Sequence, residues 1–295
     1  MATLAVGRRG VAVRRPGEPG LWDAVARALA YLVLITGAVL MFVPFLWSIS
    51  TSLKTNPEAA LFPPTLVPQQ PTLEAYRTVI QGAPFPRWFL NSTLVAAAVM
   101  IGRLLFDAMA GYAFARLRFP GREVIFSLLI ATLMVPAMVL IIPRFILLQD
   151  LGLVNTLNAL WVPSAASAFG LYLMRSFFES IPVELEEAAL IDGASRFRLY
   201  WQIILPNALP ALATLSIFSF QGSWNNFLDA VIFISGSNRD SFTLPLGLAY
   251  FRNFYYTDWP VVRAGSVLTT VKIEIVYVFF QRYFVESLAR TGVKG

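Results

Sequence analysis

The sequence contains no cysteine and no histidine among its 295 residues. The first absence excludes disulfides, thiol nucleophiles and cysteine zinc ligands, and the second excludes imidazole as an acid, a base or a ligand of zinc or haem. No glycine is followed by lysine, so the phosphate-binding loop GxxxxGK[ST] is missing as well. These absences argue against a redox or hydrolytic enzyme and against ATP hydrolysis by this chain. We expect a protein that is not an enzyme, with no cofactor and no metal.

Charged residues are scarce, because they form 14% of the chain while 57% of its residues are hydrophobic. That balance is too apolar for an ordinary soluble protein. A membrane-spanning helix needs roughly 20 mostly apolar residues. Runs of this kind occur at 28–50, 89–115, 124–148, 157–178, 208–234 and 264–284. We therefore predict an all-α membrane protein with about six transmembrane helices.

Basic residues predict the orientation of these spans. With both termini in the cytoplasm, 14 Lys and Arg residues lie inside and 6 outside, while Arg103, Arg144 and Lys272 remain within spans. An excess of basic residues in cytoplasmic loops is the usual tendency of membrane proteins, so the net charge of +6 needs no nucleic acid to explain it. The proline-rich segment 51–88 should then be an irregular external loop, and 235–263 a second external loop.

The cytoplasmic segment 180–207 is longer and more acidic than the turn at 119–122. It reads SIPVELEEAALIDGASRFRLYWQIILPN. Pro182 and the glutamates after it suit the N-terminus of a helix, and Gly193 permits a bend before a second amphipathic stretch. This pattern predicts two short helices that meet at a turn. Taken alone, it leaves open whether they bind a partner protein or lie on the lipid surface.

The motif residues in this segment resemble the EAA signature of binding-protein-dependent ABC importer permeases. The pattern EAAxxDGAxxxxxxxxIxLP is formed by Glu187, Ala188, Ala189, Asp192, Gly193, Ala194, Ile203, Leu205 and Pro206. The resemblance extends to 50–54, 112–122, 224–228 and 281–295. Together these stretches are most similar to the sugar-importer branch, in particular to permease subunits of the maltose-transporter type.

The resemblance implies an inner-membrane permease that forms a heterodimer with a second permease. Its further partners would be two ATPase subunits, an extracytoplasmic solute-binding protein, a small-molecule carbohydrate and membrane lipid, with no nucleic acid. It divides the chain into a cytoplasmic segment 1–27, a permease domain 28–286 that includes the EAA loop 180–207, and a cytoplasmic tail 287–295.

In that family the EAA loop is a coupling helix seated in a cleft of the ATPase. Small Ala188, Ala189 and Ala194 would permit close approach there, while Glu187 and Asp192 would accept ion pairs. The resemblance also implies that 235–263 meets the solute-binding protein and that 291–295 contacts an ATPase subunit.

Polar residues interrupt the apolar run 208–234. The candidates for a substrate pathway are Gln221, Trp224, Asn225 and Asn226, with Ser223 among them. Intramembrane polar groups usually face a cavity or a partner helix. An aromatic face beside amides would suit a sugar, whereas hydrogen bonding between helices is the structural alternative.

Four charged residues within spans are candidates for structural ion pairs. Arg103 and Asp107 lie four positions apart, on one helical face, where they can neutralise each other. Asp229 and Lys272 replace residues that are usually aromatic or proline in the family. They fall at a similar depth in the last two spans, so we predict that they pair.

Three alternatives remain at this stage, one of which is a sensory or scaffold membrane protein that binds partners without moving solute. Cationic residues within spans leave open the import of glycerol-3-phosphate or another polyol derivative. A protein of a different class, an ion-coupled secondary transporter, would transport without ATPases and would leave the EAA loop without a role.

Overall fold

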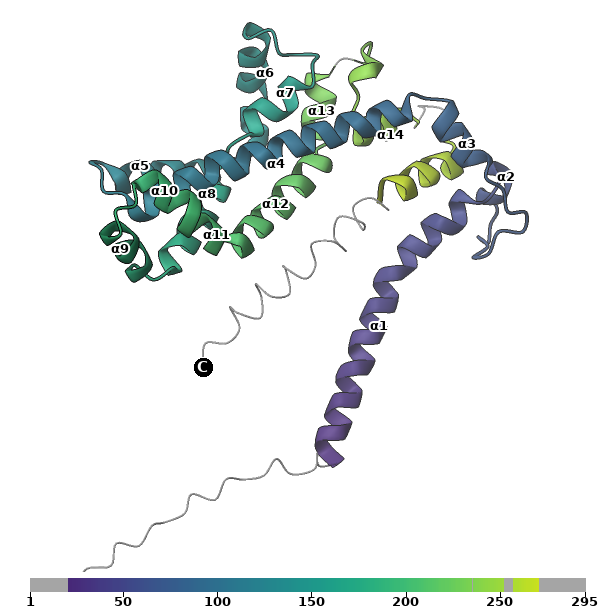
Figure 1. The fold of residues 1–295 in the computed structure, drawn as a ribbon. Helices are drawn as coiled ribbons and strands as arrows, with labels where there is room; N and C mark the ends of the chain where they lie inside the picture. The colour runs from purple at the N-terminus through teal and green to yellow at the C-terminus, as the bar shows by residue number, and fades with distance from the viewer. Residues whose placement is uncertain (1–20, 235, 252–256, 271–295) are drawn as a thin grey trace, which may run out of the picture. The chain divides into compact units, whose positions relative to one another are not determined.

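The computed structural model describes residues 21–234, 236–251 and 257–270. The regular elements named in those ranges are all helices, as expected for an all-α protein (Figure 1). The chain divides into two units, 1–48 and 49–295. Lys272, most of the predicted span 264–284 and the tail 287–295 lie outside the described residues.

Most of the first unit that the structure describes is one long helix. This helix, α1, covers Leu21–Ser52, and its stretch Ala24–Ser52 is long and apolar enough to cross a membrane. Pro44 interrupts its backbone bonding, and the Ser48 hydroxyl donates to the Pro44 carbonyl at 2.9 Å. The predicted span 28–50 is therefore helical over its whole length.

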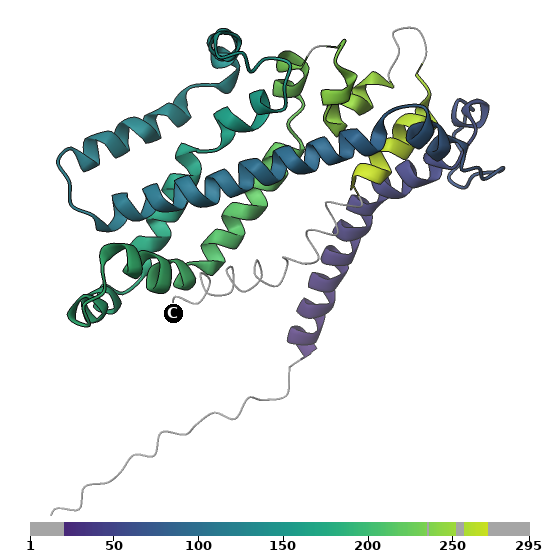
Figure 2. The same ribbon diagram turned by 45° about the horizontal axis from the view of Figure 1, so that its top comes forward.

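The second unit is organised around α4 (Phe85–Arg116), which lies beside α8 (Ala168–Ser180) and α12 (Leu209–Trp224) in both views (Figures 1 and 2). Glycine permits this packing. A Cβ atom on Gly111 would lie 2.6 Å from the Met174 Cβ, and one on Gly102 would lie 2.8 Å from the Ala165 Cβ. Small residues at such contacts let helix backbones approach closely within a membrane.

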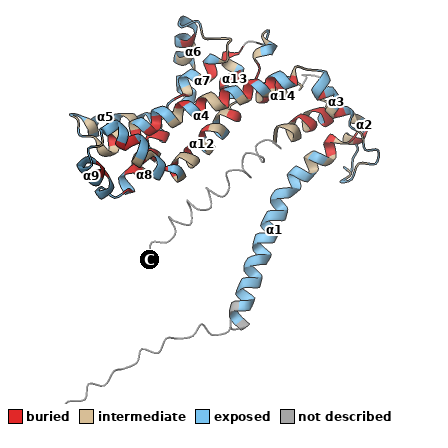
Figure 3. Ribbon diagram, in the orientation of Figure 1, coloured by how far each residue is buried: buried red, intermediate tan, exposed pale blue. Residues whose placement is uncertain are grey.

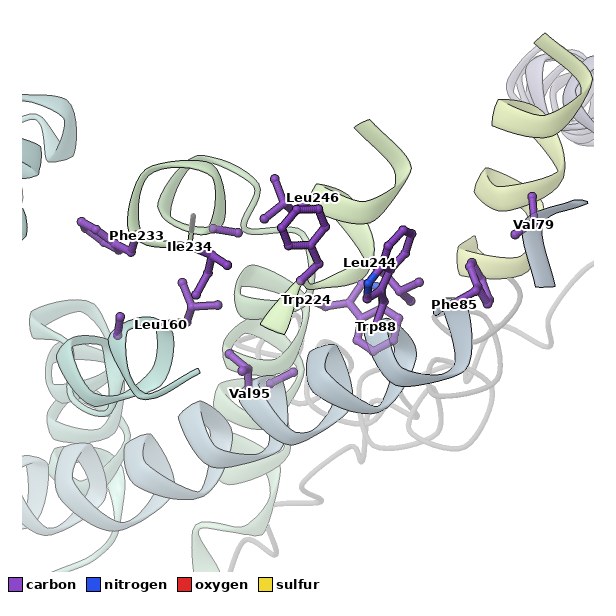
Figure 4. Close-up of a cluster of buried hydrophobic side chains, with 14 of the residues drawn as sticks. Val79, Phe85, Trp88, Val95, Leu160, Trp224, Phe233, Ile234, Leu244 and Leu246 are labelled. Atoms are coloured by element: carbon purple, nitrogen blue, oxygen red, sulfur yellow. The ribbon is translucent and has the colours of Figure 1, made fainter. Parts of the chain in front are cut away.

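Two clusters of buried apolar side chains hold α4 in place. One surrounds the first half of α4 and includes Trp88, Trp224 and Phe233 (Figure 4). The other surrounds its second half and includes Tyr112 and Phe178. Figure 3 shows buried positions along α4, where the neighbouring helices cover it, and exposed positions elsewhere on the same helix.

The predicted span 124–148 is a bent pair of helical segments. The first segment is formed by α5 (Arg122–Ala131) and η1 (Thr132–Met134), and the second by η2 (Ala137–Leu140) and α6 (Ile141–Asp150). They are bent by 96° at a break that contains Pro136, whose ring cannot continue a helix. A second pair, Arg196–Asn207 and Leu209–Trp224, is bent by 78°. The described residues thus hold two helices able to span a membrane, or four if each bent pair is one span, and six stays a prediction.

The elements named in the two segments predicted to be external loops, 51–88 and 235–263, are short helices. The first loop holds α2 (Asn56–Ala59) and α3 (Glu74–Gln81), and α4 begins at Phe85 rather than at the predicted 89 because Pro86 is tolerated in a first turn. The second holds η5 (Arg239–Ser241) and α14 (Leu244–Tyr250), which are attached to α4. Trp88 Nε1 donates to the Arg239 carbonyl at 2.8 Å, and Asn91 donates to the Asp240 carbonyl at 2.7 Å.

The remaining connections are short. They are α7 (Asn158–Trp161) and η3 (Val162–Ser164) before α8, and α13 (Leu228–Phe233) after α12. The predicted span 208–234 is therefore divided between two helices, because the chain leaves the helical conformation between Trp224 and Leu228.

Candidate functional site

The EAA loop folds as two helical pieces that meet at Gly193. The first piece is α9 (Glu184–Ile191), and the second runs through α10 (Arg196–Leu199), the π-helical η4 (Tyr200–Ile204) and α11 (Leu205–Asn207). Gly193 has a φ of +78°, which favours glycine, and the Ser195 hydroxyl caps α10 by accepting from the Arg198 N–H. The predicted pair of helices with a turn at Gly193 is confirmed.

The two faces of α9 have different environments. Glu187, Ala188 and Asp192 are exposed, so they are available to a partner protein. Ala189 is buried against the core cluster around Tyr112. Its side chain thus lies on the face of α9 opposite Glu187 and Ala188, and its predicted close approach to a partner stays a prediction.

The second helical piece anchors the loop to the membrane helices. Tyr200 and Ile204 are buried, and the Tyr200 ring lies 5.1 Å from that of Tyr112 on α4. Leu205 is half-buried and Pro206 exposed, beside the bend that leads into α12. Leu205 and Pro206 thus lie where the loop joins α12, and Ala194 is half-buried at the turn.

One residue of this site escaped the sequence analysis. Glu186 is buried, and its Oε1 lies 2.9 Å from Nε of Arg116 at the end of α4. Burial raises the pKa of Glu186, and the nearby Arg116 and Arg196 oppose that rise. In the sequence, only its position next to the EAA motif could have indicated a role for Glu186. That position does not distinguish the buried Glu186 from its exposed neighbour Glu187.

The four candidate pathway residues do not lie together. Trp224 is 1% exposed and packs in the core, with its ring 5.7 Å from Phe220. Asn226 donates to Asp229 at 2.9 Å. Gln221 and Asn225 are exposed on the outer face of α12. In the described structure the Trp224 ring is buried inside this chain, and its predicted role in a sugar pathway stays a prediction.

Arg103 and Asp107 share a helical face, but they do not form an ion pair within 4.0 Å in the described structure. Each bonds instead to the segment before α8. Arg103 Nε donates to the Ser164 carbonyl at 3.0 Å, and Asp107 accepts from the Ser167 N–H and hydroxyl at 2.8 and 3.0 Å. The sequence spacing predicted the shared face correctly. It missed that the backbone across the interface offers better partners than the neighbouring side chain.

Asp229 is paired with Arg144, a residue that the sequence analysis left unpaired. Arg144 Nη1 and Nη2 donate to the two carboxylate oxygens of Asp229 at 3.2 and 3.0 Å, and the Asp229 N–H donates to the Asn226 side chain. The guanidinium also lies 5.3 Å from the centre of the Phe233 ring. Since Lys272 lies outside the described residues, its predicted pairing with Asp229 stays a prediction. In the described structure Arg144 already provides the charge that Asp229 requires.

The apolar helices of the described residues define a helical membrane protein. Its EAA loop is anchored to the membrane helices and leaves one face of α9 exposed. This chain belongs to the family of binding-protein-dependent transport system inner membrane components, whose model matches residues 107–290. The match covers the second half of α4, both bent pairs and the EAA loop.

Curated relatives are similar over most of their length. The permease protein AraQ of an arabinooligosaccharide transport system from Halalkalibacterium halodurans is 36% identical over 83% of this chain and 86% of its own. The diacetylchitobiose uptake permease NgcG from Streptomyces coelicolor is 36% identical over 89% and 87%. The trehalose/maltose permease MalG from Thermococcus litoralis is 34% identical over 90% and 98%.

Solved structures agree with the fold. A chain of a bacterial ABC transporter involved in the import of the acidic polysaccharide alginate has a TM-score of 0.79 and 26% identity, over 90% of this chain and 98% of that one. A chain from an alginate transporter in complex with a pentasaccharide-bound periplasmic protein has a TM-score of 0.63 at 14% identity, which supports the fold alone.

Proposed function

We propose that this chain is one of two permease subunits of an ATP-driven importer that receives a carbohydrate from an extracytoplasmic binding protein. Two ATPase subunits would hydrolyse ATP, since the chain lacks a phosphate-binding loop of its own. The observation that carries the proposal is the EAA loop, because α9 exposes Glu187, Ala188 and Asp192 while its other face is fixed to α4 and α8.

A neutral oligosaccharide is the substrate class that the described residues favour. An anionic substrate such as a polyol phosphate needs cations along the pathway. Arg144 is engaged with Asp229, and Arg103 donates to a backbone carbonyl. Three relatives are named for neutral sugars, namely arabinooligosaccharides, diacetylchitobiose and trehalose or maltose, whereas the solved transporter reported above imports the acidic polysaccharide alginate.

The pathway side of this subunit is proposed to be the outer face of α12. Phe218, Gln221 and Asn225 recur there at helical spacing, and all three are exposed. An aromatic ring supplies a surface for the C–H groups of a sugar, and amides can donate to and accept from its hydroxyls. Phe218 thus takes the role that the sequence analysis gave to Trp224.

The test is reconstitution of the chain with its second permease, its ATPase subunits and its binding protein in proteoliposomes. Radiolabelled neutral oligosaccharides should accumulate only when ATP and the loaded binding protein are both present. Gln221→Ala and Asn225→Ala should reduce uptake, whereas Gln81→Ala, an exposed change on α3 and outside both α12 and the EAA loop, serves as the matched control.

Two outcomes would contradict the proposal. Uptake driven by an ion gradient without ATPase subunits would indicate a secondary transporter. Preferential uptake of glycerol-3-phosphate over neutral sugars would favour the polyol-phosphate alternative.

A further inference from the structure

Arg116 connects three elements at the end of α4. It is the last residue of that helix, and its Nη2 donates to the carbonyl of Phe178 at 2.7 Å and to that of Ile181. Phe178 lies in the last turn of α8 and Ile181 directly follows that helix, and the Phe178 carbonyl also accepts from the Ile181 N–H at 3.2 Å. The Arg116 Nε lies 2.9 Å from Oε1 of Glu186 in the first turns of α9. One guanidinium therefore contacts α4, α8 and α9.

The pair is shielded from solvent. The side chains of Arg116 and Glu186 are 10% and 7% exposed. Beside them, the Tyr112 ring lies 6.0 Å from that of Phe178 and 5.1 Å from that of Tyr200. A largely buried guanidinium that contacts several acceptors holds its partners in a defined geometry, which a flexible surface pair does not.

The space around the pair is open on one side. A cavity of about 840 Å³ separates α9 from the turn that follows α4, and Arg116 and Glu186 both line it. Close apolar packing therefore does not fill the gap between α9 and this turn. The ion pair links α4 to α9 at the edge of the cavity, beside the buried contact that Ala189 makes with the core cluster.

Stability of the fold does not explain the pair. Burial raises the pKa of Glu186 even though Arg116 is adjacent, so the ionised carboxylate is less stable here than in water. Buried ion pairs often contribute little net stability, because the cost of removing two charges from water offsets their attraction. What the pair does provide is a defined position of α9 relative to α4 and α8.

We propose that the pair of Arg116 and Glu186 transmits movement of α9 to the cytoplasmic ends of α4 and α8, so that both are positioning residues for coupling. This inference rests on the proposed function, in which the exposed face of α9 docks on an ATPase subunit. Without the pair, a movement of α9 with the ATPase subunit would not be transmitted to α4 and α8.

The experiment compares Glu186→Ala with Glu74→Ala, an exposed glutamate in the first turn of α3 and outside the EAA loop, in the complete transporter in proteoliposomes. The quantity measured is sugar taken up per ATP hydrolysed, together with the amount of ATPase subunit that co-purifies. Glu186→Ala should assemble normally and keep ATP hydrolysis, but uptake per ATP should fall about tenfold, within the range typical of coupling between sites. Glu74→Ala should behave as wild type. Glu186→Gln keeps an oxygen acceptor for Arg116 and should restore most of the coupling.

Arg116→Gln tests the same link from the other side and should lower uptake per ATP as well. It also carries the test if Glu186→Ala does not fold. Unchanged uptake per ATP in either variant would overturn the inference, and so would loss of ATPase binding in Glu186→Ala with normal melting. A wild-type complex that assembles but takes up no sugar would instead refute the proposed function.

Discussion

At the scale of single residues, the charged side chains within the predicted spans pair with groups that their spacing in the sequence does not predict. Asp229 and Arg144 lie 85 positions apart in the chain. The bend at Pro136 directs α6 away from the axis of α5, and Arg144 on α6 reaches α13. The predicted pair of Asp229 and Lys272 rests on equal depths along straight spans. Such a comparison of depths misses Arg144, because the span that contains Arg144 is bent. The sequence analysis did identify Asp229 correctly as a carboxylate that needs a cationic partner.

The pair predicts a specific pattern of stability. Asp229→Asn or Arg144→Met alone should each lower the free energy of unfolding by about 1 to 3 kcal/mol, because the other charge is left partly buried without its ionic partner. The double variant should lose less than the sum of the two. Melting temperatures in detergent measure this, with Lys272→Met combined with Asp229→Asn as the comparison. Strictly additive losses for Asp229 and Arg144 would show that they do not interact.

Glu186 makes stability depend on pH in a defined direction. Because its pKa is raised above 4.5 in the folded protein, the unfolded chain releases this proton at lower pH, and stability falls as pH rises through the window from 4.5 to the raised pKa. The charged groups that face it are Arg116 and Arg196, with the Tyr112 hydroxyl nearby. The melting temperature of Glu186→Gln relative to wild type should therefore increase from pH 4.5 upwards and then level off. A decrease over that range would mean that attraction to Arg116 outweighs burial.

At the scale of secondary structure, the sequence predicts helix ends and turns from nearby residues. It does not predict contacts between residues that are distant in the sequence. Pro182, Gly193 and the acidic first turn predicted α9 and its turn, because caps and left-handed glycines act within a few residues. The internal face of α9 could not be predicted in the same way. Which of Glu186 and Glu187 is buried depends on where α4 and α8 lie, and the sequence of the loop does not contain that information.

The close contact between α4 and α8 predicts that a larger side chain at Gly111 destabilises the protein. Gly111→Val should lower stability by about 1 to 3 kcal/mol, since its side chain would collide with Met174 and force the helices apart. Gly222→Ala on α12 is the control for melting, because nothing lies within 4 Å of the added carbon. Equal melting temperatures for both variants would contradict the close packing of α4 on α8.

At the scale of the whole molecule, the basic residues predict an orientation that chemical labelling can test. The chain has no native cysteine, so single cysteines can be introduced without a background. Ser195→Cys on the EAA loop should be protected from an impermeant maleimide added outside intact cells, whereas Phe62→Cys, at a residue that is 93% exposed in the first external loop, should react. Labelling of Ser195→Cys from outside would reverse the proposed topology.

The central claim is that the EAA loop couples ATP hydrolysis to movement of the spans. Gly193 has a φ of +78°, which proline cannot adopt, so Gly193→Pro should displace α9 from α10 while leaving the spans inserted. The most direct measurement records sugar uptake and binding-protein-stimulated ATP hydrolysis together, in proteoliposomes that contain the wild type or Gly193→Pro. We predict that both activities fall at least tenfold in the variant, with normal amounts of the chain in the membrane. Normal uptake with normal stimulated hydrolysis in Gly193→Pro would contradict the account.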